Sequence, residues 1–150
     1  GVSERGVLRQ HYETDALDAS TLLAAAFKFL TPNDERLRNT VLAIAEELTE
    51  NGFVLRYHTE ETDDGLSGKE GTFLICSFWL VSALAIVGEM QRAYDLMERL
   101  LRIASPLGLS AEEFDPETGR HLGNFPQAFS HLALIEAAGR IIVTERLIEF

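Results

Sequence analysis

Two short segments of the sequence combine residue types that could do chemistry. Glu112 and Glu113 are adjacent in AEEFD (residues 111–115), and a positioned carboxylate can act as a general acid or base. Arg56 and Tyr57 place a guanidinium, which donates hydrogen bonds, next to an aromatic ring that can stack. Taken alone, however, two acids in an acidic chain also fit a solvated loop, and Arg56 also fits a surface ion pair.

The sequence shows no other catalytic or ligand-binding pattern. The four histidines, His11, His58, His121 and His131, lie in different segments without the spacing of metal ligands. There is no G-x-S-x-G motif and no P-loop, and Gly65, Gly68 and Gly71 are too scattered to cradle a nucleotide. We therefore predict neither a metal ion nor a cofactor.

Length and charge restrict the class of partner. The 150 residues suit a single domain, and 46% hydrophobic residues can build its core. A net charge of −11 repels phosphate backbones and anionic lipid, so neither nucleic acid nor a membrane surface is an expected partner, whereas a neutral sugar is unaffected.

Cys76 lies in an apolar run and is predicted to be a reduced core residue. The polar first residues lack a signal peptide, which predicts a cytoplasmic protein.

Apolar residues recur at helical spacing along most of the chain. Helices are predicted at residues 17–30 (capped by Asp15 or Asp18), between an N-cap at Thr31 and a stop at Gly52, at 72–87, at 89–104, and from 124 to at least 138. In the first of them, Leu22, Leu23, Ala26, Phe27 and Leu30 share one face. Residues 53–57 are predicted to be extended, and residues 58–68 and 106–123 to be loops.

The helix predicted at residues 72–87 is apolar on every side. Its uncharged stretch is marginal for a membrane span, which needs roughly 20 apolar residues, and we interpret it as a buried helix with Trp79 in the core. Two concentric rings of helices would explain why one helix is wholly apolar and its neighbours are amphipathic. A simple antiparallel bundle is also compatible with the pattern.

Three separated motifs resemble the glucoamylase family, family 15 of the glycoside hydrolases, which includes bacterial and archaeal trehalases. They are DALDAS (residues 15–20), GKEGTFLICSFW (68–79) and GNFPQAFSH (123–131). The resemblance implies an all-α fold, a partial (α/α)6 toroid built of helical hairpins, with residues 1–150 as the C-terminal portion of the catalytic domain. The complete domain would be roughly twice this length.

The resemblance also implies roles for individual residues. The family inverts the sugar configuration with two carboxylates about 6.5–9.5 Å apart. Residue-by-residue matching makes Glu112 the general base, and nothing here matches the motif of the general acid. Arg56 and Tyr57 correspond to a pair that contacts the sugar being cleaved. Glu70 would face the cavity mouth or cap the buried helix.

Residues around the third motif are also interpreted through the resemblance. Fungal members have serine where this chain has Gly123, so a hydroxyl that could support the base is missing. Asn124 resembles a helix N-cap, and His131 is interpreted as structural.

Two functions remain open at this point. The first is a fragment of an inverting α-glycoside hydrolase, glucoamylase-like or trehalase-like, whose partner is an α-glucoside disaccharide or oligosaccharide. The second is a non-catalytic helical interaction domain. A toroid cut at this point would expose apolar side chains, so self-association through the cut face is predicted.

Overall fold

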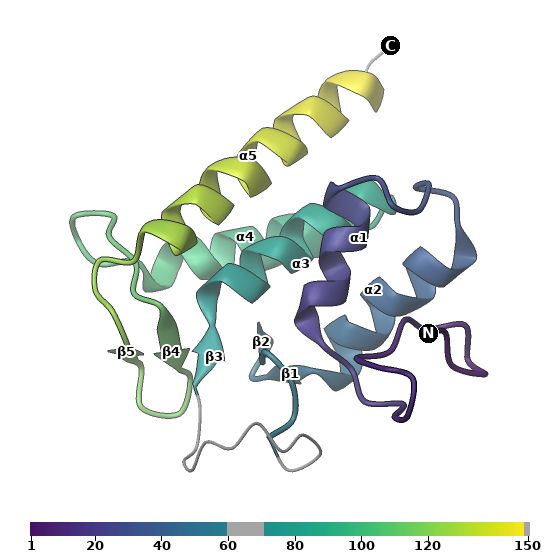
Figure 1. The fold of residues 1–150 in the computed structure, drawn as a ribbon. Helices are drawn as coiled ribbons and strands as arrows, with labels where there is room; N and C mark the ends of the chain where they lie inside the picture. Colours follow the sequence, from purple (N-terminus) through teal and green to yellow (C-terminus); the bar gives the residue numbers. More distant parts are fainter. Residues whose placement is uncertain (60–70, 149–150) are drawn as a thin grey trace.

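The computed structural model describes residues 1–59 and 71–148, and within them the chain is mainly helical (Figure 1). The helices are the 3-10 turn η1 (Ala19–Leu22), α1 (Leu23–Ala26), α2 (Glu35–Glu47), α3 (Leu74–Ile86), α4 (Met90–Ile103) and α5 (Ala128–Ile148). The strands are β1 (Thr49–Glu50), β2 (Phe53–Val54), β3 (Thr72–Phe73), β4 (Glu113–Asp115) and β5 (Arg120–Leu122). β1 and β2 form an antiparallel pair, and β3, β4 and β5 form an antiparallel sheet in that order. Both sheets lie near the N-terminal end of α3 (Figure 1).

Helix α3 is the centre of the fold. It packs against α1, α2, α4 and α5, and ten of its 13 residues are buried, so it is covered on nearly every side. Burying one leucine or phenylalanine side chain contributes about 1.5–3 kcal/mol, and α3 buries Leu74, Phe78 and Leu84 among others. The prediction of a buried helix is confirmed. Among the described residues no helix is both long and apolar enough to span a membrane.

Helix α4 shows the opposite pattern. Its buried residues, Ala93, Leu96, Met97 and Leu100, follow the spacing of a single helical face, and the rest of the helix is polar. An inner helix covered all round and an outer amphipathic neighbour are what the sequence predicts for two layers of helices. The all-α class is therefore confirmed, with small sheets added at the connections.

Helix α2 starts and stops at other residues than predicted. Asp34, not Thr31, is the N-cap, and its carboxylate accepts a hydrogen bond from Arg36 N at 2.9 Å. The helix ends at Glu47, before Gly52. Asn51 and Gly52, with φ of 48° and 80°, instead form the two-residue turn that joins β1 to β2. Positive φ at both positions is the geometry of a type I′ hairpin, which favours Asn-Gly.

The first predicted helix is shorter than expected. η1 begins after Asp18, whose side chain caps it by accepting from Ser20 N at 2.7 Å, and α1 ends at Ala26. Lys28 then adopts a left-handed conformation (φ 56°), which stops the helix. Of the residues predicted to share one face, Leu22 is buried, whereas Phe27 is 77% exposed.

The C-terminal part also departs from the prediction. The segment predicted as a loop at 106–123 contains the β4–β5 hairpin, and α5 begins at Ala128 rather than near Asn124. Two of the four residues before α5, Asn124 and Gln127, hydrogen-bond to Glu112 and Ser110 instead of starting the helix.

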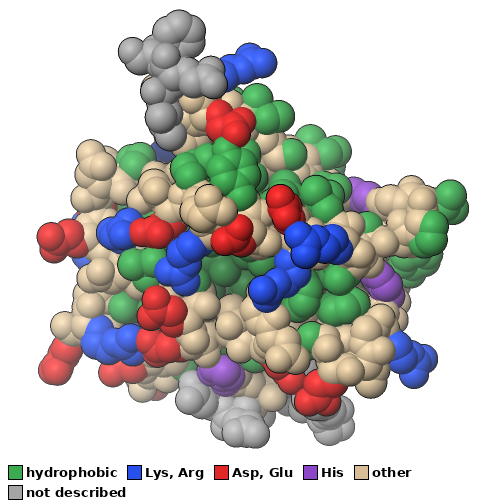
Figure 2. Space-filling model, turned by 180° about the vertical axis from the view of Figure 1, so that it is seen from behind, with side chains coloured by type: hydrophobic (Ala, Val, Ile, Leu, Met, Phe, Trp, Pro, Cys, Tyr) green, Lys and Arg blue, Asp and Glu red, His purple; other side chains and the backbone are tan. Residues whose placement is uncertain are grey.

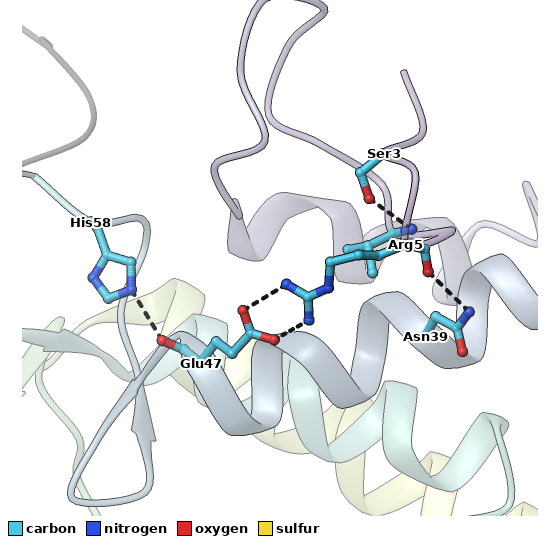
Figure 3. A network of polar contacts seen from close by, with 6 residues as sticks. Ser3, Arg5, Asn39, Glu47 and His58 are labelled. Carbon is cyan, nitrogen blue, oxygen red and sulfur yellow. Dashed lines mark hydrogen bonds and ion pairs between the residues drawn. The ribbon is translucent and has the colours of Figure 1, made fainter.

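The N-terminal segment is fastened to α2 by polar contacts (Figure 3). The guanidinium of Arg5 binds both carboxylate oxygens of Glu47, and Asn39 donates to the Arg5 carbonyl at 3.4 Å. The contact with Arg5 holds the pKa of Glu47 below its ordinary value.

On the rear face of the molecule, acidic and basic side chains are interspersed (Figure 2). Ion pairs among the described residues include Arg38–Glu89, Arg92–Glu46 and Arg102–Glu98.

Candidate active site

The segment that carries Glu112 is attached to the start of α3. Leu74 N, in the first turn of that helix, donates to the Glu112 carbonyl at 3.1 Å. Strand β3 pairs with β4 directly beside this contact, with Thr72 opposite Phe114 and Phe73 opposite Glu113. The buried hydroxyl of Thr72 also donates to the Phe114 carbonyl at 2.7 Å. Glu112 is therefore placed at the N-terminal end of the central helix.

The backbone before Glu112 is held by the start of α5. Ser110 N donates to His131 Nε2 at 3.3 Å, and the Ser110 carbonyl accepts from Gln127 N at 2.9 Å. The buried Ser130 hydroxyl donates to the Ala111 carbonyl at 2.7 Å. His131 Nδ1 donates to the Gln127 carbonyl at 2.7 Å, so both ring nitrogens bind backbone groups. The interpretation of His131 as a structural residue agrees with these contacts.

The two adjacent glutamates point to different partners. Glu113 lies in β4, and its Oε2 accepts from Gly71 N at 2.9 Å, which fixes the chain just before β3. Gly71 is packed so closely there that a Cβ would lie 3.1 Å from Glu113 Oε2. Glu112 precedes the strand and so turns to the other side, as alternation requires. The carboxylate of Glu113 is thus part of the scaffold, and that of Glu112 is not.

The carboxylate of Glu112 is bound by Asn124. Its Oε2 accepts from Asn124 N at 3.1 Å and from Asn124 Nδ2 at 2.9 Å. Within residues 1–59 and 71–148, no group hydrogen-bonds its other oxygen, Oε1. The prediction that Asn124 caps the last helix is wrong, because α5 begins only at Ala128; Asn124 instead donates from its backbone and its side chain to Glu112. Among the described residues, one oxygen of this carboxylate is thus held by Asn124 and the second has no hydrogen-bond partner.

Arg56 and Tyr57 are fixed from both sides. The Arg56 carbonyl accepts from Ala19 N at 2.9 Å, and Tyr57 forms a β-bridge with Asp18. Directly after them, His58 Nε2 donates to the Glu47 carbonyl at 3.0 Å, at the end of α2 (Figure 3). This segment is therefore anchored to η1 and to α2.

Phe73 connects this segment with the one that carries Glu112. The Arg56 guanidinium lies 4.6 Å from the centre of the Tyr57 ring and 5.1 Å from that of Phe73. Phe73 is the residue opposite Glu113 in the sheet, so Arg56 approaches the same end of α3 as Glu112. A guanidinium held over two aromatic rings is pre-oriented with little loss of side-chain entropy.

Cys76 lies in the first turn of α3, close to this region. The pKa of its thiol is raised to about 12, mainly by burial and also by the charge of Asp18, against an opposing effect of the charge of Arg56. A thiol in this state is protonated at neutral pH and is a poor nucleophile. The prediction of a reduced, buried Cys76 is confirmed, and the thiol adds no chemistry to the site.

The remaining sequence predictions have mixed outcomes. Glu70 lies outside the described residues. Trp79, predicted as a core residue, is only partly buried and lines a groove between α1 and α5 together with Phe27 and Phe129. The described part of the chain holds no group of three or more His, Cys, Asp or Glu side chains that could bind a metal ion.

Sequence reasoning missed the contact between Asn124 and Glu112. The only signal was that Asn124 follows a glycine, in a segment that resembles the family. A polar residue just before a proline and a helix is also typical of a cap, and the competing tertiary contact is not visible in the sequence.

Known proteins that resemble this chain agree with one another. The trehalase of Mycolicibacterium smegmatis is 67% identical over 145 residues, covering 97% of this chain and 22% of that protein. The trehalase of Thermoplasma acidophilum is 40% identical over 132 residues, covering 88% of this chain and 22% of that protein. The chain thus spans about a fifth of the length of these curated relatives.

Solved structures of a glycosidase share the fold. The wild-type glycosidase superimposes with a TM-score of 0.79 at 22% identity, over 95% of this chain and 40% of that one. A variant in complex with glucose gives a TM-score of 0.78 at 22% identity, with the same coverage. This likeness confirms the predicted fold class, a partial helical toroid.

Residues 2–139 match the family described as glycosyl hydrolases family 15. The match takes in the three sequence motifs and every described residue that lies around Glu112 and Arg56. The chain belongs to family 15 of the glycosyl hydrolases.

Proposed function

We propose that the polypeptide containing this chain hydrolyses α,α-trehalose with inversion of configuration, and that Glu112 is its general base. The support for this substrate is the group of curated relatives, which carry the name trehalase at 67% and 40% identity. Because the chain spans 22% of their length, the activity is proposed for the complete polypeptide. A cytoplasmic location stays a prediction.

The observation that carries the proposal is the divided role of two adjacent carboxylates. Among the described residues, Glu113 is bound to Gly71 N, whereas the carboxylate of Glu112 is held by one oxygen, on a backbone fixed to α3 and α5. A base in an inverting hydrolase must hold and deprotonate a water on the face of the sugar opposite the leaving group. A carboxylate with one anchored oxygen and one open oxygen is suited to this task, because its orientation is set before the water arrives.

Two further parts of the proposed reaction are the contacts with the sugar and the general acid. Arg56 and Tyr57, pre-oriented beside Phe73, would donate to hydroxyls of the sugar being cleaved. The general acid would come from outside residues 1–150, about 6.5–9.5 Å from Glu112. Produced alone, these residues are expected to hydrolyse neither trehalose nor maltose, because a base without its acid lacks half of the proton transfer.

The test compares the two glutamates in the full-length protein with trehalose as substrate. Glu112→Gln should lower kcat by ~10²–10⁴-fold, the range for a lost general acid or base, with a smaller change in KM. Glu113→Gln should stay within about tenfold, because the amide oxygen can still accept from Gly71 N. Equal effects of the two substitutions, or a larger effect at Glu113, would show that the base is assigned to the wrong residue.

The second candidate function, a helical interaction module, is favoured by one observation. On α5, Phe129, Leu132 and Ile135 are each more than 60% exposed. Phe27 and Phe29, on the segment after α1, are also exposed, and Phe27 lines one groove together with Phe129 and Leu132. Apolar side chains gathered in this way are typical of a surface that packs against other protein. Both functions are compatible, since one concerns the end of α3 and the other the outer face of α5.

A further inference from the structure

Asn124 contacts Glu112 in three ways. The Glu112 N–H donates to the Asn124 carbonyl at 3.0 Å, and the Asn124 backbone and side-chain N–H groups both donate to Glu112 Oε2. No other described residue hydrogen-bonds this carboxylate. Within the described part of the chain, the orientation of the Glu112 carboxylate therefore depends on Asn124, an exposed residue that does not contribute to the core.

Gly123 makes this geometry possible. In the hairpin, Leu122 pairs with Glu113, so the residue expected opposite Glu112 is Gly123. Gly123, with φ of 68°, is instead an extra residue, and Asn124 hydrogen-bonds to Glu112. A Cβ at Gly123 would lie 2.8 Å from Glu112 Oε2 and 3.0 Å from Glu112 Cβ. A serine at this position would collide with the carboxylate in the observed conformation. The missing hydroxyl noted in the sequence is therefore replaced by donors from the next residue.

We propose that Asn124 is a positioning residue, which fixes one oxygen of Glu112 so that the other faces the attacking water. This inference rests on the proposed role of Glu112 as the base. Asn124 would contribute to the rate without touching the substrate. Hydrogen bonds to an ionised carboxylate are about twice as strong as neutral ones, so the loss of one is measurable even at an exposed site.

The side chain is tested by two substitutions in the full-length protein. Asn124→Ala keeps the backbone N–H and removes the amide, and it should lower kcat for trehalose by about 10- to 100-fold with little change in KM. Asn124→Asp keeps the shape but replaces the donor with a negative charge. It should be at least as damaging. As the pH is lowered, kcat/KM should begin to fall at a higher pH than in the parent, because a second carboxylate favours the protonated form of Glu112.

Two controls separate positioning from general damage. Thr118→Ala removes a contact with Asp115 at the far end of the same hairpin, and it should leave kcat within about threefold. In the Glu112→Gln background, Asn124→Ala should cost little further activity, because both residues act through one group.

The outcomes distinguish this inference from the proposed function. If Glu112→Gln retains wild-type activity, the proposed function fails, whatever Asn124 does. If Glu112→Gln abolishes activity but Asn124→Ala stays within threefold, the inference is overturned and the base stands. Wild-type activity of Asn124→Asp would also overturn the inference, because only the shape of the side chain would then matter. The same holds if the losses of activity in Glu112→Gln and Asn124→Ala multiply in the double variant, because the two residues would then act independently.

Discussion

Substituting Gly123 by alanine would disturb the candidate base without removing any polar group. Two penalties act on this variant. A non-glycine residue in the left-handed region costs about 1–2 kcal/mol, of which ~0.4–1 kcal/mol is offset by the lower entropy of the unfolded chain. The new Cβ would also lie 2.8 Å from Glu112 Oε2, so the carboxylate must move.

Gly119 supplies a matched control in the same hairpin. Its φ is 70°, nearly that of Gly123, but a Cβ there would meet nothing within 4 Å. Gly119→Ala should therefore lose about 1 kcal/mol from the backbone penalty alone, and Gly123→Ala should lose at least as much, because the clash with Glu112 is added. Only Gly123→Ala should displace Glu112, and a misplacement of about 1 Å costs ~10²-fold in rate.

The assay is kcat and KM for trehalose together with the melting temperature, measured for both variants in the full-length protein. We expect a lower melting temperature for both variants, with a shift for Gly123→Ala at least as large as that for Gly119→Ala. Activity should stay within about threefold of wild type for Gly119→Ala, and kcat should be ~10²-fold lower for Gly123→Ala. Equal activities of the two variants would refute the reasoning, because the steric contact with Glu112 is the only feature that distinguishes them.

Three further predictions concern other parts of the chain. Because burial raises the pKa of Cys76 to about 12, the native thiol should react with a disulfide reagent at about pH 8 no faster than the protein unfolds, and rapid labelling would contradict its position. Contact with Arg36 lowers the pKa of Asp34 from 3.8 to about 2, so its carboxylate stabilises the fold above the unfolded value, and this contribution is lost as the pH falls towards 2. Asp34→Asn retains a capping side chain, and its melting temperature should fall less steeply than that of the parent between about pH 4 and pH 2; parallel curves would exclude the linkage. Residues 1–150 produced alone should self-associate through the exposed apolar residues of α5 and the segment after α1, and a 16.7 kDa monomer in sedimentation equilibrium at micromolar concentration would rule this out.

The helices were predictable because their signals are local. Apolar spacing identifies α2, α3 and α4 within a few residues of their bounds, and the absence of charge in α3 indicates a helix covered on every side. The hairpin turn at Asn51 and Gly52 also has a local signal, because the dipeptide Asn-Gly is typical of a two-residue turn between strands. It was overlooked because glycine after a helix is equally typical of a helix stop.

The site was only partly predictable. Glu112, Arg56 and Tyr57 were proposed from the family resemblance, and the structure brings their segments to one end of α3 without testing their roles. The strands β3, β4 and β5 have two or three residues each, too few to show an alternating pattern. The partners of Glu113 and Asn124 are set by contacts between distant segments, on which local sequence has no bearing.

The way in which Glu112 is held has a consequence for the order of events during folding. Gly71 and Glu113 are 42 residues apart, Ser110 and His131 are 21 apart, and Ala111 and Ser130 are 19 apart. Closing such a long loop costs conformational entropy before the contact can stabilise the fold. These contacts therefore form after the local turns of the helices. A chain that has regained its helical circular dichroism should therefore still lack an oriented Glu112. Catalytic competence would return with the docking of α5, later than secondary structure.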